Sequence, residues 1–289
     1  MSVFSCAVLY TRAVKRRTFL KRLFSSFIAA PFLVGGYGAA SAYSFEISRH
    51  SFKMPHLQTS LKVVQLTDLH YGKFMFAPQV RAWVNATNLE KPDLIVITGD
   101  VIDHGLSSQK LESLAKELGR LKAPLGVFVT LGNHDYSTPT GQRFDTQILI
   151  GHLEKVGLKY LVNQGVSLRP DFFLAGVDDF WEGVVRISKA IQDARENTAL
   201  MLLSHNPDIL PKVPERVGLM LSGHTHGGQI RAPFGQGLSC ISKYGERYQM
   251  GFIKEKTTAF VSRGLGCTGV PVRTFCPAEL VVLELLPTE

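Results

Sequence analysis

The sequence contains little cysteine and no paired-cysteine motif. Its 289 residues include four cysteines, the first at position 6, and no CxxC occurs. The remaining three, Cys240, Cys267 and Cys276, are an odd number, so neither a disulfide framework nor a thiolate zinc site is indicated. We expect all three to be small buried hydrophobic residues.

Acidic residues are absent from residues 1–42, which hold six Lys and Arg. The whole chain has 32 Lys and Arg against 24 Asp and Glu, a net charge of +8, so the basic excess is mostly N-terminal. No nucleic acid is expected as a partner, because that needs basic residues clustered on the folded domain. With 45% apolar and 19% charged residues, the chain is neither disordered nor a disulfide-rich miniprotein. A single stretch could enter a bilayer, which excludes a multi-span membrane protein.

Residues 1–42 have the organisation of an export signal. Arg16 and Arg17 precede Thr-Phe-Leu-Lys, an uncharged run covers residues 23–44, and Ala40-Ser41-Ala42 matches a cleavage site. The paired arginines resemble a twin-arginine signal, so the twin-arginine export machinery is an expected partner and cleavage is expected after Ala42. Retention as a membrane anchor stays open, since about 20 helical residues cross a bilayer. The expected location is the periplasm or cell envelope, with membrane or cell-wall association.

Beyond residue 60, apolar runs end abruptly in Gly, Asp, Asn or Ser-His. These predicted strands are residues 61–66, 94–98, 125–131, 199–203 and 217–221. Helical spacing occurs in residues 78–90, 109–122, 144–156 and 185–196. Two further strand-like runs, 257–262 and 279–286, have no helix between them. The pattern predicts one α/β domain over residues 43–289, with a mixed sheet.

Five polar motifs follow these strands, where α/β proteins collect their ligands. They are Asp68-Leu69-His70, Gly99-Asp100, Gly132-Asn133-His134-Asp135, His205 and Gly223-His224-Thr225-His226. Carboxylate, imidazole and amide groups form a mixed N/O set, which suits Mn, Fe or Zn better than Ca or Mg. Each motif alone is weak, because a lone D-x-H is more often a capped turn. The ordered set of five predicts a metal centre.

This ordered set resembles the calcineurin-like metallophosphoesterase superfamily, whose pattern is D-x-H, G-D, G-N-H-[DE], H and G-H-x-H. The resemblance covers about residues 60–286 and implies a four-layer α/β/β/α sandwich with mixed sheets and two divalent metal ions. It implies that one ion is held by Asp68, His70 and His226, the other by Asn133, His205 and His224, with Asp100 bridging and His134 as a catalytic non-ligand. Residues 261–273 resemble the exported and membrane-associated branch that includes the YkuE and YaeI proteins.

The implied chemistry is metal-dependent hydrolysis of a phosphate ester, with a phosphodiester favoured over a monoester. Two cations roughly 3.5–4 Å apart clamp the phosphoryl group and lower the pKa of bound water towards about 7. His134 is expected to protonate the leaving oxygen, and Asp135 either to orient that imidazole or to cap a turn. Two alternatives stay open. One is a pyrophosphatase on a UDP-linked acylated sugar of lipid A synthesis; the other is a metal-binding envelope or cell-wall protein with little turnover.

Other signals carry less weight. Residues 264–269 match G-x-G-x-x-G, but the Val-Pro-Val that follows does not suit the helix that a dinucleotide site needs. His104 is interpreted as a loop histidine with a possible accessory role. Arg231, Arg263 and Arg273 are interpreted as surface charges or as contacts to a substrate phosphate.

Overall fold

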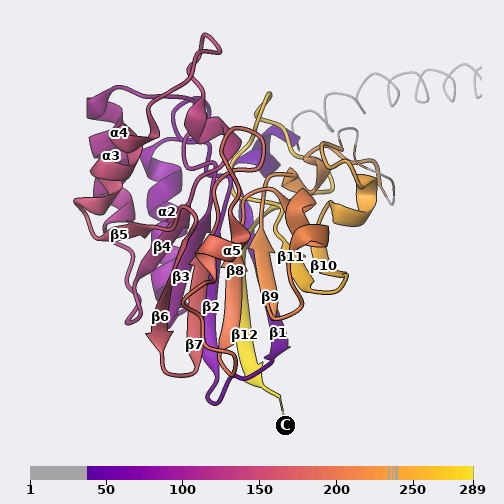
Figure 1. Cartoon of the computed structure of the whole chain (residues 1–289). Coiled ribbons are helices and arrows are strands. Elements are labelled where there is room, and N and C mark those ends of the chain that lie inside the picture. Colours follow the sequence, from indigo (N-terminus) through magenta and orange to yellow (C-terminus); the bar gives the residue numbers. More distant parts are fainter. Residues whose placement is uncertain (1–37, 234, 236, 238–239, 289) are drawn as a thin grey trace, which may run out of the picture.

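The computed structural model describes residues 38–233, 235, 237 and 240–288, which are built on two β-sheets (Figure 1). The twin-arginine motif and most of the predicted signal lie in residues 1–37, outside the described residues. The end of that segment, residues 38–42, forms a helical turn, and Ala42 is buried in the core. Across the described ranges, no helix has the length and hydropathy needed to cross a membrane.

The first sheet has six strands in the order β1-β12-β2-β3-β4-β5. Their bounds are β1 Phe45–Met54, β2 Leu61–Leu66, β3 Leu94–Thr98, β4 Val127–Thr130, β5 Leu158–Tyr160 and β12 Ala278–Pro287. Strands β2 to β5 pair in parallel, whereas β12 runs antiparallel to β2 and parallel to β1. The sheet is therefore mixed, as the last strand-like runs of the sequence predict.

The second sheet also has six strands, in the order β10-β11-β9-β8-β7-β6. Their bounds are β6 Gln164–Arg169, β7 Phe172–Gly176, β8 Ala199–Leu203, β9 Leu219–Ser222, β10 Gly251–Lys254 and β11 Thr258–Val261. The four central strands are parallel, and β6 and β10 close the two edges in antiparallel fashion. All five residues of β3 and all five of β8 are buried, because both faces of these central strands are covered.

Helices cover the outer face of each sheet and complete the four layers (Figure 1). On the first sheet lie α2 Ala77–Leu89, α3 Ser108–Leu118 and α4 Thr146–Glu154. The layer on the second sheet is thinner, with α5 Ile187–Ala190 and the 3₁₀ segments η2 Pro207–Lys212 and η4 Gly245–Tyr248. The predicted helix over residues 185–196 is thus too long. Ala190, Ile191 and Ala194 alone are buried there, too few to hold further turns against the sheet.

The two sheets pack face to face through one shared core. Val63, Val96 and Phe128 of the first sheet meet Leu174 and Met201 of the second in a single cluster of buried side chains. Burial of this kind contributes about 1.5–3 kcal/mol for each large side chain. The core therefore holds the strand ends of both sheets at fixed positions, which the functional site requires.

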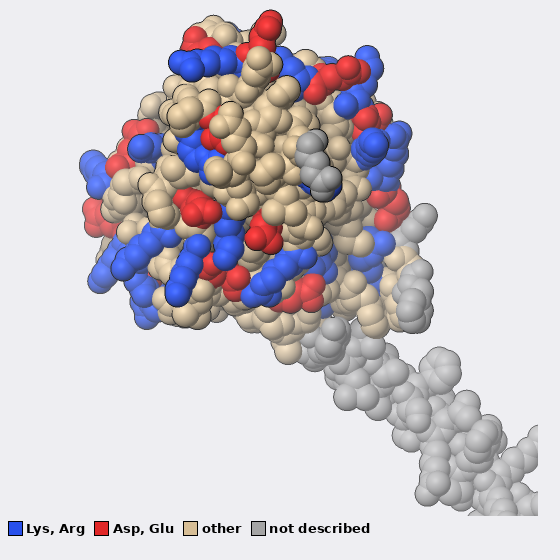
Figure 2. All heavy atoms as spheres, turned by 90° about the horizontal axis from the view of Figure 1, so that it is seen from below, with Lys and Arg blue, Asp and Glu red and all other residues tan. Residues whose placement is uncertain are grey.

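The carboxyl ends of the parallel strands meet at one end of the sandwich. Strand β12 runs down to the C-terminus at the bottom of Figure 1 and is antiparallel to β2, so β2, β3 and β4 end at the top. The opposite face, seen from below in Figure 2, carries basic and acidic side chains interspersed around a mostly uncharged centre. Chemistry is therefore expected at the upper end, where the polar motifs lie.

Candidate metal centre

The seven predicted ligands come from loops that follow parallel strands of both sheets. Asp68 and His70 follow β2, Asp100 follows β3, Asn133 begins the 3₁₀ segment η1 Asn133–Tyr136 after β4, His205 follows β8, and His224 and His226 follow β9. Six of the seven are buried, and Asn133 is partly buried with its side-chain oxygen enclosed. The two sheets thus contribute to one polar cluster at their common edge.

The backbone at these ligands adopts a conformation that side chains rarely take. Five ligands have left-handed φ values: 53° at Asp68, 45° at His70, 49° at Asp100, 73° at His224 and 51° at His226. Among the described residues, ten non-glycine positions have positive φ, and half of them are predicted ligands. Each such position costs on the order of 1–3 kcal/mol and persists only where the surroundings enforce it. The strain turns the side chains of D-x-H and G-H-x-H into one space.

Two glycines allow the ligand loops to touch. A Cβ at Gly132 would lie 2.2 Å from Asp100 Oδ1, and a Cβ at Gly223 would lie 2.2 Å from Asp68 Oδ2. Any side chain at either position would therefore displace a ligand carboxylate. This explains the glycine that precedes each histidine motif in the sequence.

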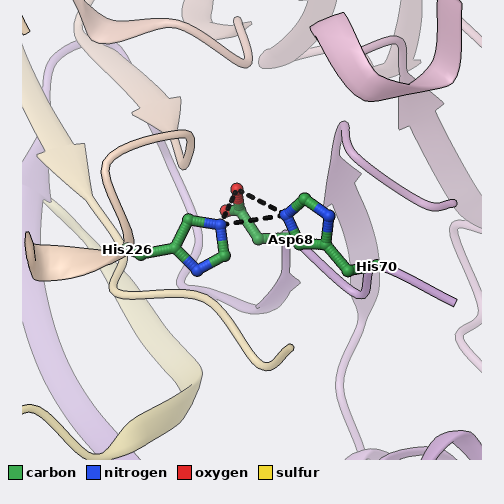
Figure 3. Close-up of side chains that lie close together, drawn as sticks. All are labelled: Asp68, His70 and His226. Atoms are coloured by element: carbon green, nitrogen blue, oxygen red, sulfur yellow. Dashed lines mark hydrogen bonds and ion pairs between the residues drawn. The ribbon is translucent and has the colours of Figure 1, made fainter. Parts of the chain in front are cut away.

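One group of ligand atoms comes from Asp68, His70 and His226, whose side chains converge in Figure 3. The Nε2 atoms of His70 and His226 are 2.9 Å apart. Asp68 Oδ1 lies 3.3 Å from His226 Nε2 and 4.0 Å from His70 Nε2. Two ring nitrogens and a carboxylate this close are stable only around a shared proton or cation, because their lone pairs otherwise repel.

A second group is built around Asp100, which stands between the two sets of histidines. Asp100 Oδ2 lies 3.2 Å from His205 Nε2 and 3.5 Å from His70 Nε2. His205 Nδ1 donates to the carbonyl of Thr98 at 2.8 Å, which leaves Nε2 as its ligand atom. The position of Asp100 suits a carboxylate that bridges two cations.

The donor set also fits metal because it leaves ligand atoms without a protein partner. Asn133 Oδ1 and His224 Nε2 are buried and make no hydrogen bond in the described structure. A buried unpaired polar atom costs about 1–3 kcal/mol, and a cation satisfies it. The same atoms belong to the residues that the sequence pattern assigns to a second ion.

The charge states of three residues in the cluster, His224, His226 and Asp100, favour cation binding. Burial lowers the pKa of His224 to about 3, and burial together with His70 lowers that of His226 well below its usual value. Both imidazoles are therefore neutral, the form that binds metal. Burial raises the pKa of Asp100, but the neighbouring His205 and His134 outweigh it and hold this carboxyl well below its usual pKa. The bridging position is thus an anion.

His134 is partly buried beside the predicted ligands, and together with His70 and Asp100 it forms one of three groups of side chains that could hold a metal ion. Its backbone N–H donates to Asp100 Oδ1 at 2.9 Å, and its Nδ1 lies 2.9 Å from the carbonyl of Asp103. The ring meets His70 edge-on at 4.7 Å. Burial lowers the pKa of His134, but Asp100 and the carbonyl of Asp103 outweigh it and raise the pKa above its usual value.

Asp135 does not orient the His134 imidazole. Its two carboxylate oxygens accept from the backbone N–H groups of Ile102 at 3.0 Å and Gly132 at 2.9 Å, so it braces two ligand loops. The turn-capping reading of the sequence is therefore the correct one. Burial and the charge of Asp100 raise the pKa of Asp135 to about 7.

Asp103 lies beside the predicted ligands and was missed by the sequence analysis. It is buried, its Oδ1 lies 3.3 Å from His70 Nδ1, and its Oδ2 lies 3.0 Å from His104 Nε2. A carboxylate on the far nitrogen of a ligand histidine fixes its tautomer and aims its other nitrogen at the metal. The signal in the sequence was the second Asp of Gly-Asp-Val-Ile-Asp, three residues after Asp100.

The three arginines are all engaged within the protein. Arg273 is fully buried and lies behind the site, donating to the carbonyl of Gly266 at 2.7 Å, with Nη2 3.3 Å from His226 Nδ1. Arg263 pairs with Glu46 and Glu279, and Arg231 pairs with Glu246. For Arg273 the surface-charge interpretation is therefore wrong: its guanidinium ties the loop of residues 263–266 to a ligand.

Two further side chains depart from or add to the sequence analysis. Cys267 and Cys276 are buried as expected, but Cys240 is exposed, so the expectation of burial fails there. Trp181 is 50% exposed, and its ring meets that of His224 edge-on with centroids 4.3 Å apart. Asp179 holds the Trp181 loop by accepting from two backbone N–H groups, each at 2.8 Å.

Comparison with known proteins agrees with this geometry. Residues 61–228, more than half of the chain, match the model of the calcineurin-like phosphoesterase family. An uncharacterized metallophosphoesterase, YkuE of Bacillus subtilis, is 32% identical over 96% of this chain and 99% of its own length. A second from Aquifex aeolicus is 30% identical over 88% of this chain and 96% of its own. A zebrafish transmembrane protein with a metallophosphoesterase domain is 28% identical, and the match covers 93% of this chain and 63% of the fish protein.

Among solved structures, TT1561 of Thermus thermophilus aligns with a TM-score of 0.47 at 13% identity, over 72% of this chain and 91% of that one. The family match and the curated relatives, together with the Asp and His clusters, identify a metal-dependent hydrolase of phosphoric esters. This chain belongs to the calcineurin-like phosphoesterase family.

Proposed function

We propose that the chain hydrolyses phosphodiesters in preference to phosphomonoesters, with two divalent cations of the Mn, Fe or Zn type. The observation that carries the proposal is the position of Asp100, which stands between His70 on one side and His205 on the other. A carboxylate shared by two sets of donors is the arrangement that a dinuclear centre needs. One set is Asp68, His70 and His226; the other is Asn133, His205 and His224.

Bound there, the cations would supply Lewis acidity at the phosphoryl oxygens and a water whose pKa falls towards about 7. The chain's own residues hold the ligand carboxylates in place. The N–H groups of His134 and His224 fix the carboxylates of Asp100 and Asp68, so the two ligand loops cannot turn away. Preorganised groups of this kind act without a reorganisation cost at the moment of reaction.

His134 is assigned the proton for the leaving oxygen. Its Nδ1 is held by the carbonyl of Asp103 at 2.9 Å, which directs Nε2 away from the loop. Because the pKa of His134 is raised, the ring is a cation over a wider pH range and carries a proton on Nε2. Such a group contributes about 10²–10⁴ in rate.

The preference for a diester follows from charge. A monoester dianion carries two negative charges and gains more from additional cationic side chains than a diester, which carries one. Three arginines lie close in sequence to the last ligand loop or in the loop behind it. All three are held by carboxylates or carbonyls of the protein: Arg231, Arg263 and Arg273. The site therefore suits the singly charged ester.

The test is metal content together with turnover. We would purify the full chain, measure bound metal by elemental analysis, and compare bis-p-nitrophenyl phosphate with p-nitrophenyl phosphate in added Mn²⁺. About two metal ions per chain with faster diester turnover is the expected result. Faster monoester turnover would refute the diester preference. Metal without turnover of either compound would favour the acyl-sugar pyrophosphatase or the envelope-binding alternative.

The variant His134→Ala separates an enzyme from a binder. Because His134 belongs to neither ligand group as assigned, the variant should keep its metal ions and lose about 10²–10⁴ in kcat. A protein that only binds metal in the envelope would show no change. Loss of metal from the variant would mean that His134 is a ligand, and the assignment above would then be wrong.

We also propose that the chain is exported by the twin-arginine machinery and works in the periplasm or cell envelope. Support comes from Arg16-Arg17 before Phe-Leu-Lys and from the uncharged run that follows. Changing both arginines to lysine should leave the protein in the cytoplasm, as fractionation would show. Unchanged export of this variant would refute the proposal.

A further inference from the structure

A cavity of about 530 Å³ lies on the side of the candidate metal centre where His134 stands. Its wall includes Asp103 and His104 but none of the predicted ligands. The rings of His104 and His134 are stacked with centroids 5.8 Å apart, and the carbonyl of Asp103 lies 2.9 Å from His134 Nδ1. Because His134 is assigned the proton for the leaving oxygen, the cavity borders the leaving-group side of the site. Its volume is within the range of small-molecule sites.

Two lysines line this cavity. Lys73 follows the predicted ligand His70 by three residues, and Lys110 lies in the first turn of α3. Both side chains are exposed, and within the described part of the chain neither ammonium forms an ion pair or donates a hydrogen bond. The one contact of Lys73 is with the ring of Phe74, whose centre lies 5.2 Å from Nζ. Both charges are therefore available to a ligand.

The other ionisable groups of the cavity wall do not neutralise these lysines. The Asp103 carboxylate is buried and turned towards two imidazoles, with Oδ1 3.3 Å from His70 Nδ1 and Oδ2 3.0 Å from His104 Nε2. Burial lowers the pKa of His104, and although Asp103 opposes this, the charges of His134 and Lys73 add to the lowering. The accessible charge of the cavity is therefore that of two ammonium groups, which favours an anionic ligand.

The position of Lys110 is unfavourable for its own helix. The first turn of an α-helix carries partial positive charge from its unpaired N–H groups, so an acidic residue is favoured there and a cation is not. Helix α3 has no acidic residue in its first turn, and the side chain of its N-cap residue, Ser107, makes no capping hydrogen bond. Departures from local preference of this kind are expected at functional sites. An anion in the cavity would relieve the repulsion.

The two loops that carry the lysines are fixed to each other. The N–H of Tyr71 donates to the carbonyl of Val101 at 3.1 Å, and the N–H of Asp103 donates to the carbonyl of Tyr71 at 3.1 Å. The N–H of Gly105 donates to the carbonyl of Ser137 at 2.7 Å, which ties the second loop to the segment that holds His134. The cavity therefore keeps a fixed position relative to the metal centre.

We propose that this cavity is an anion subsite, in which Lys73 and Lys110 bind a second phosphate group on the leaving portion of the natural ester. The inference rests on the proposed function. Two ammonium point charges suit a phosphate dianion. Because the cavity wall contains Asp103 and His104 but none of the predicted ligands, the lysines select the leaving group, and the preference for a singly charged scissile phosphate is kept.

The second phosphate reacts at no step. In the hydrolysis, the water oxygen bonds to phosphorus, the P–O bond to the leaving group breaks, and the leaving oxygen takes the proton of His134. The bound phosphate supplies binding energy that positions the ester for this step. Lys73 and Lys110 are therefore specificity-determining residues.

Two aryl methyl phosphodiesters that differ only at a group remote from the reacting bond test the proposal. One leaving phenol carries a para CH2–PO3²⁻ group and the other a para CH2OH group, and the methylene keeps the two phenols similar in acidity. The full chain is loaded with Mn²⁺, and kcat/KM is measured for both esters. The phosphonate ester should be preferred about tenfold, as two exposed ion pairs would give, and added salt should reduce the preference. Equal kcat/KM values, or a preference for the neutral ester, would overturn the proposal.

Matched variants assign the preference to the cavity. Lys73→Gln and Lys110→Gln should each reduce the ratio of the two kcat/KM values about threefold, and the double variant should bring it to about one. Lys116→Gln is the control, because Lys116 is also exposed on α3 and carries the same charge but does not line the cavity. The control should keep the wild-type ratio. Equal ratios in the double variant and the control would show that the two lysines do not form the subsite.

A binding measurement separates this inference from the proposed function. The two phenols that these esters release are titrated into the Mn²⁺-loaded chain by calorimetry, which needs no turnover. Tighter binding of the phosphonate phenol, lost in the double variant and kept in Lys116→Gln, would support the subsite even if neither ester is hydrolysed. Equal binding by the wild type and both variants would mean that the metal ions hold the phosphonate. That result would overturn the subsite even if diesters are hydrolysed rapidly.

Discussion

The substitution Asp103→Asn tests how the metal centre is held from behind. Asp103 is 2% exposed, and its carboxylate lies between His70 Nδ1 at 3.3 Å and His104 Nε2 at 3.0 Å. Asparagine keeps the shape but removes the negative charge that fixes the His70 tautomer. Loss of such a partner typically weakens metal affinity or activity by 10- to 100-fold. This corresponds to about 1.4–2.8 kcal/mol.

The magnitude should fall in the upper half of that range because burial removes the competing solvent. His70 and the two Asp103 oxygens are almost inaccessible, so water cannot replace the lost charge. The backbone carbonyl of Asp103 still reaches His134, so this histidine keeps its own support. We therefore expect Asp103→Asn to weaken metal binding more than it lowers the kcat of the enzyme at saturating metal.

The assay is a titration of Mn²⁺ into the metal-free chain, read by calorimetry and checked by diester turnover at saturating metal. Asp171→Asn is the matched control, because Asp171 is also buried and hydrogen-bonded but contacts Arg169 and Gln58. The control should lose stability and keep its metal affinity. If Asp103→Asn binds Mn²⁺ as tightly as the wild type, the positioning role assigned to Asp103 is wrong.

Three further predictions concern protons, the exposed tryptophan and acid stability. Although burial lowers the pKa of His205, Asp100 raises it to about 10, so a metal ion must displace a proton from this imidazole. The affinity for Mn²⁺ should therefore fall about tenfold for each pH unit below 10, as titrations at pH 6, 7 and 8 would show. Because Trp181 contacts the His224 ring, binding of Mn²⁺ should quench the fluorescence of Trp181. The variant Trp181→Phe should abolish this change. Quenching that persists in the variant would place the metal nearer to Trp83. Hydrogen bonding from Arg169 lowers the pKa of Asp171 to about 2, so its contribution is complete above about pH 4 and lost as pH falls through 2. The stability gap to Asp171→Asn, about 1–2 kcal/mol, should close over that window in acid denaturation, and a constant gap would contradict it.

The sequence predicted the strands well because buried strands depend on local patterns, whereas the ligand assignment stays a prediction. Buried parallel strands appear as unbroken apolar runs, so residues 61–66, 94–98 and 199–203 match β2, β3 and β8 to the residue. The polar motifs follow directly, and parallel pairing then brings them to one edge. Strand β6, whose residues are mostly half-exposed and of mixed polarity, gave no comparable signal.

Residues that act through another residue were harder to predict. Asp103 has no defining spacing, and its role depends on the turn that brings it behind His70. The sequence analysis interprets Arg273 as a surface charge or as a contact to a substrate phosphate, yet it is fully buried. Buried charges of this kind are recognised only when their partners are known, since burial without a partner would be prohibitive.

The features that make the site chemically capable also link it to stability. The loops hold five predicted ligands at left-handed φ values, place two ring nitrogens 2.9 Å apart, and leave two buried side-chain atoms of predicted ligands without a hydrogen bond. Each of these opposes folding of the metal-free chain, and each is relieved when a cation joins the ligands. The close approach of the ligand loops depends on Gly132 and Gly223, because the contacts at both positions leave no room for a side chain. When a metal ion binds, this strain is relieved, and a relaxed surface cluster of the same residues would have no such strain to relieve. Metal binding should therefore raise the free energy of unfolding of this protein strongly.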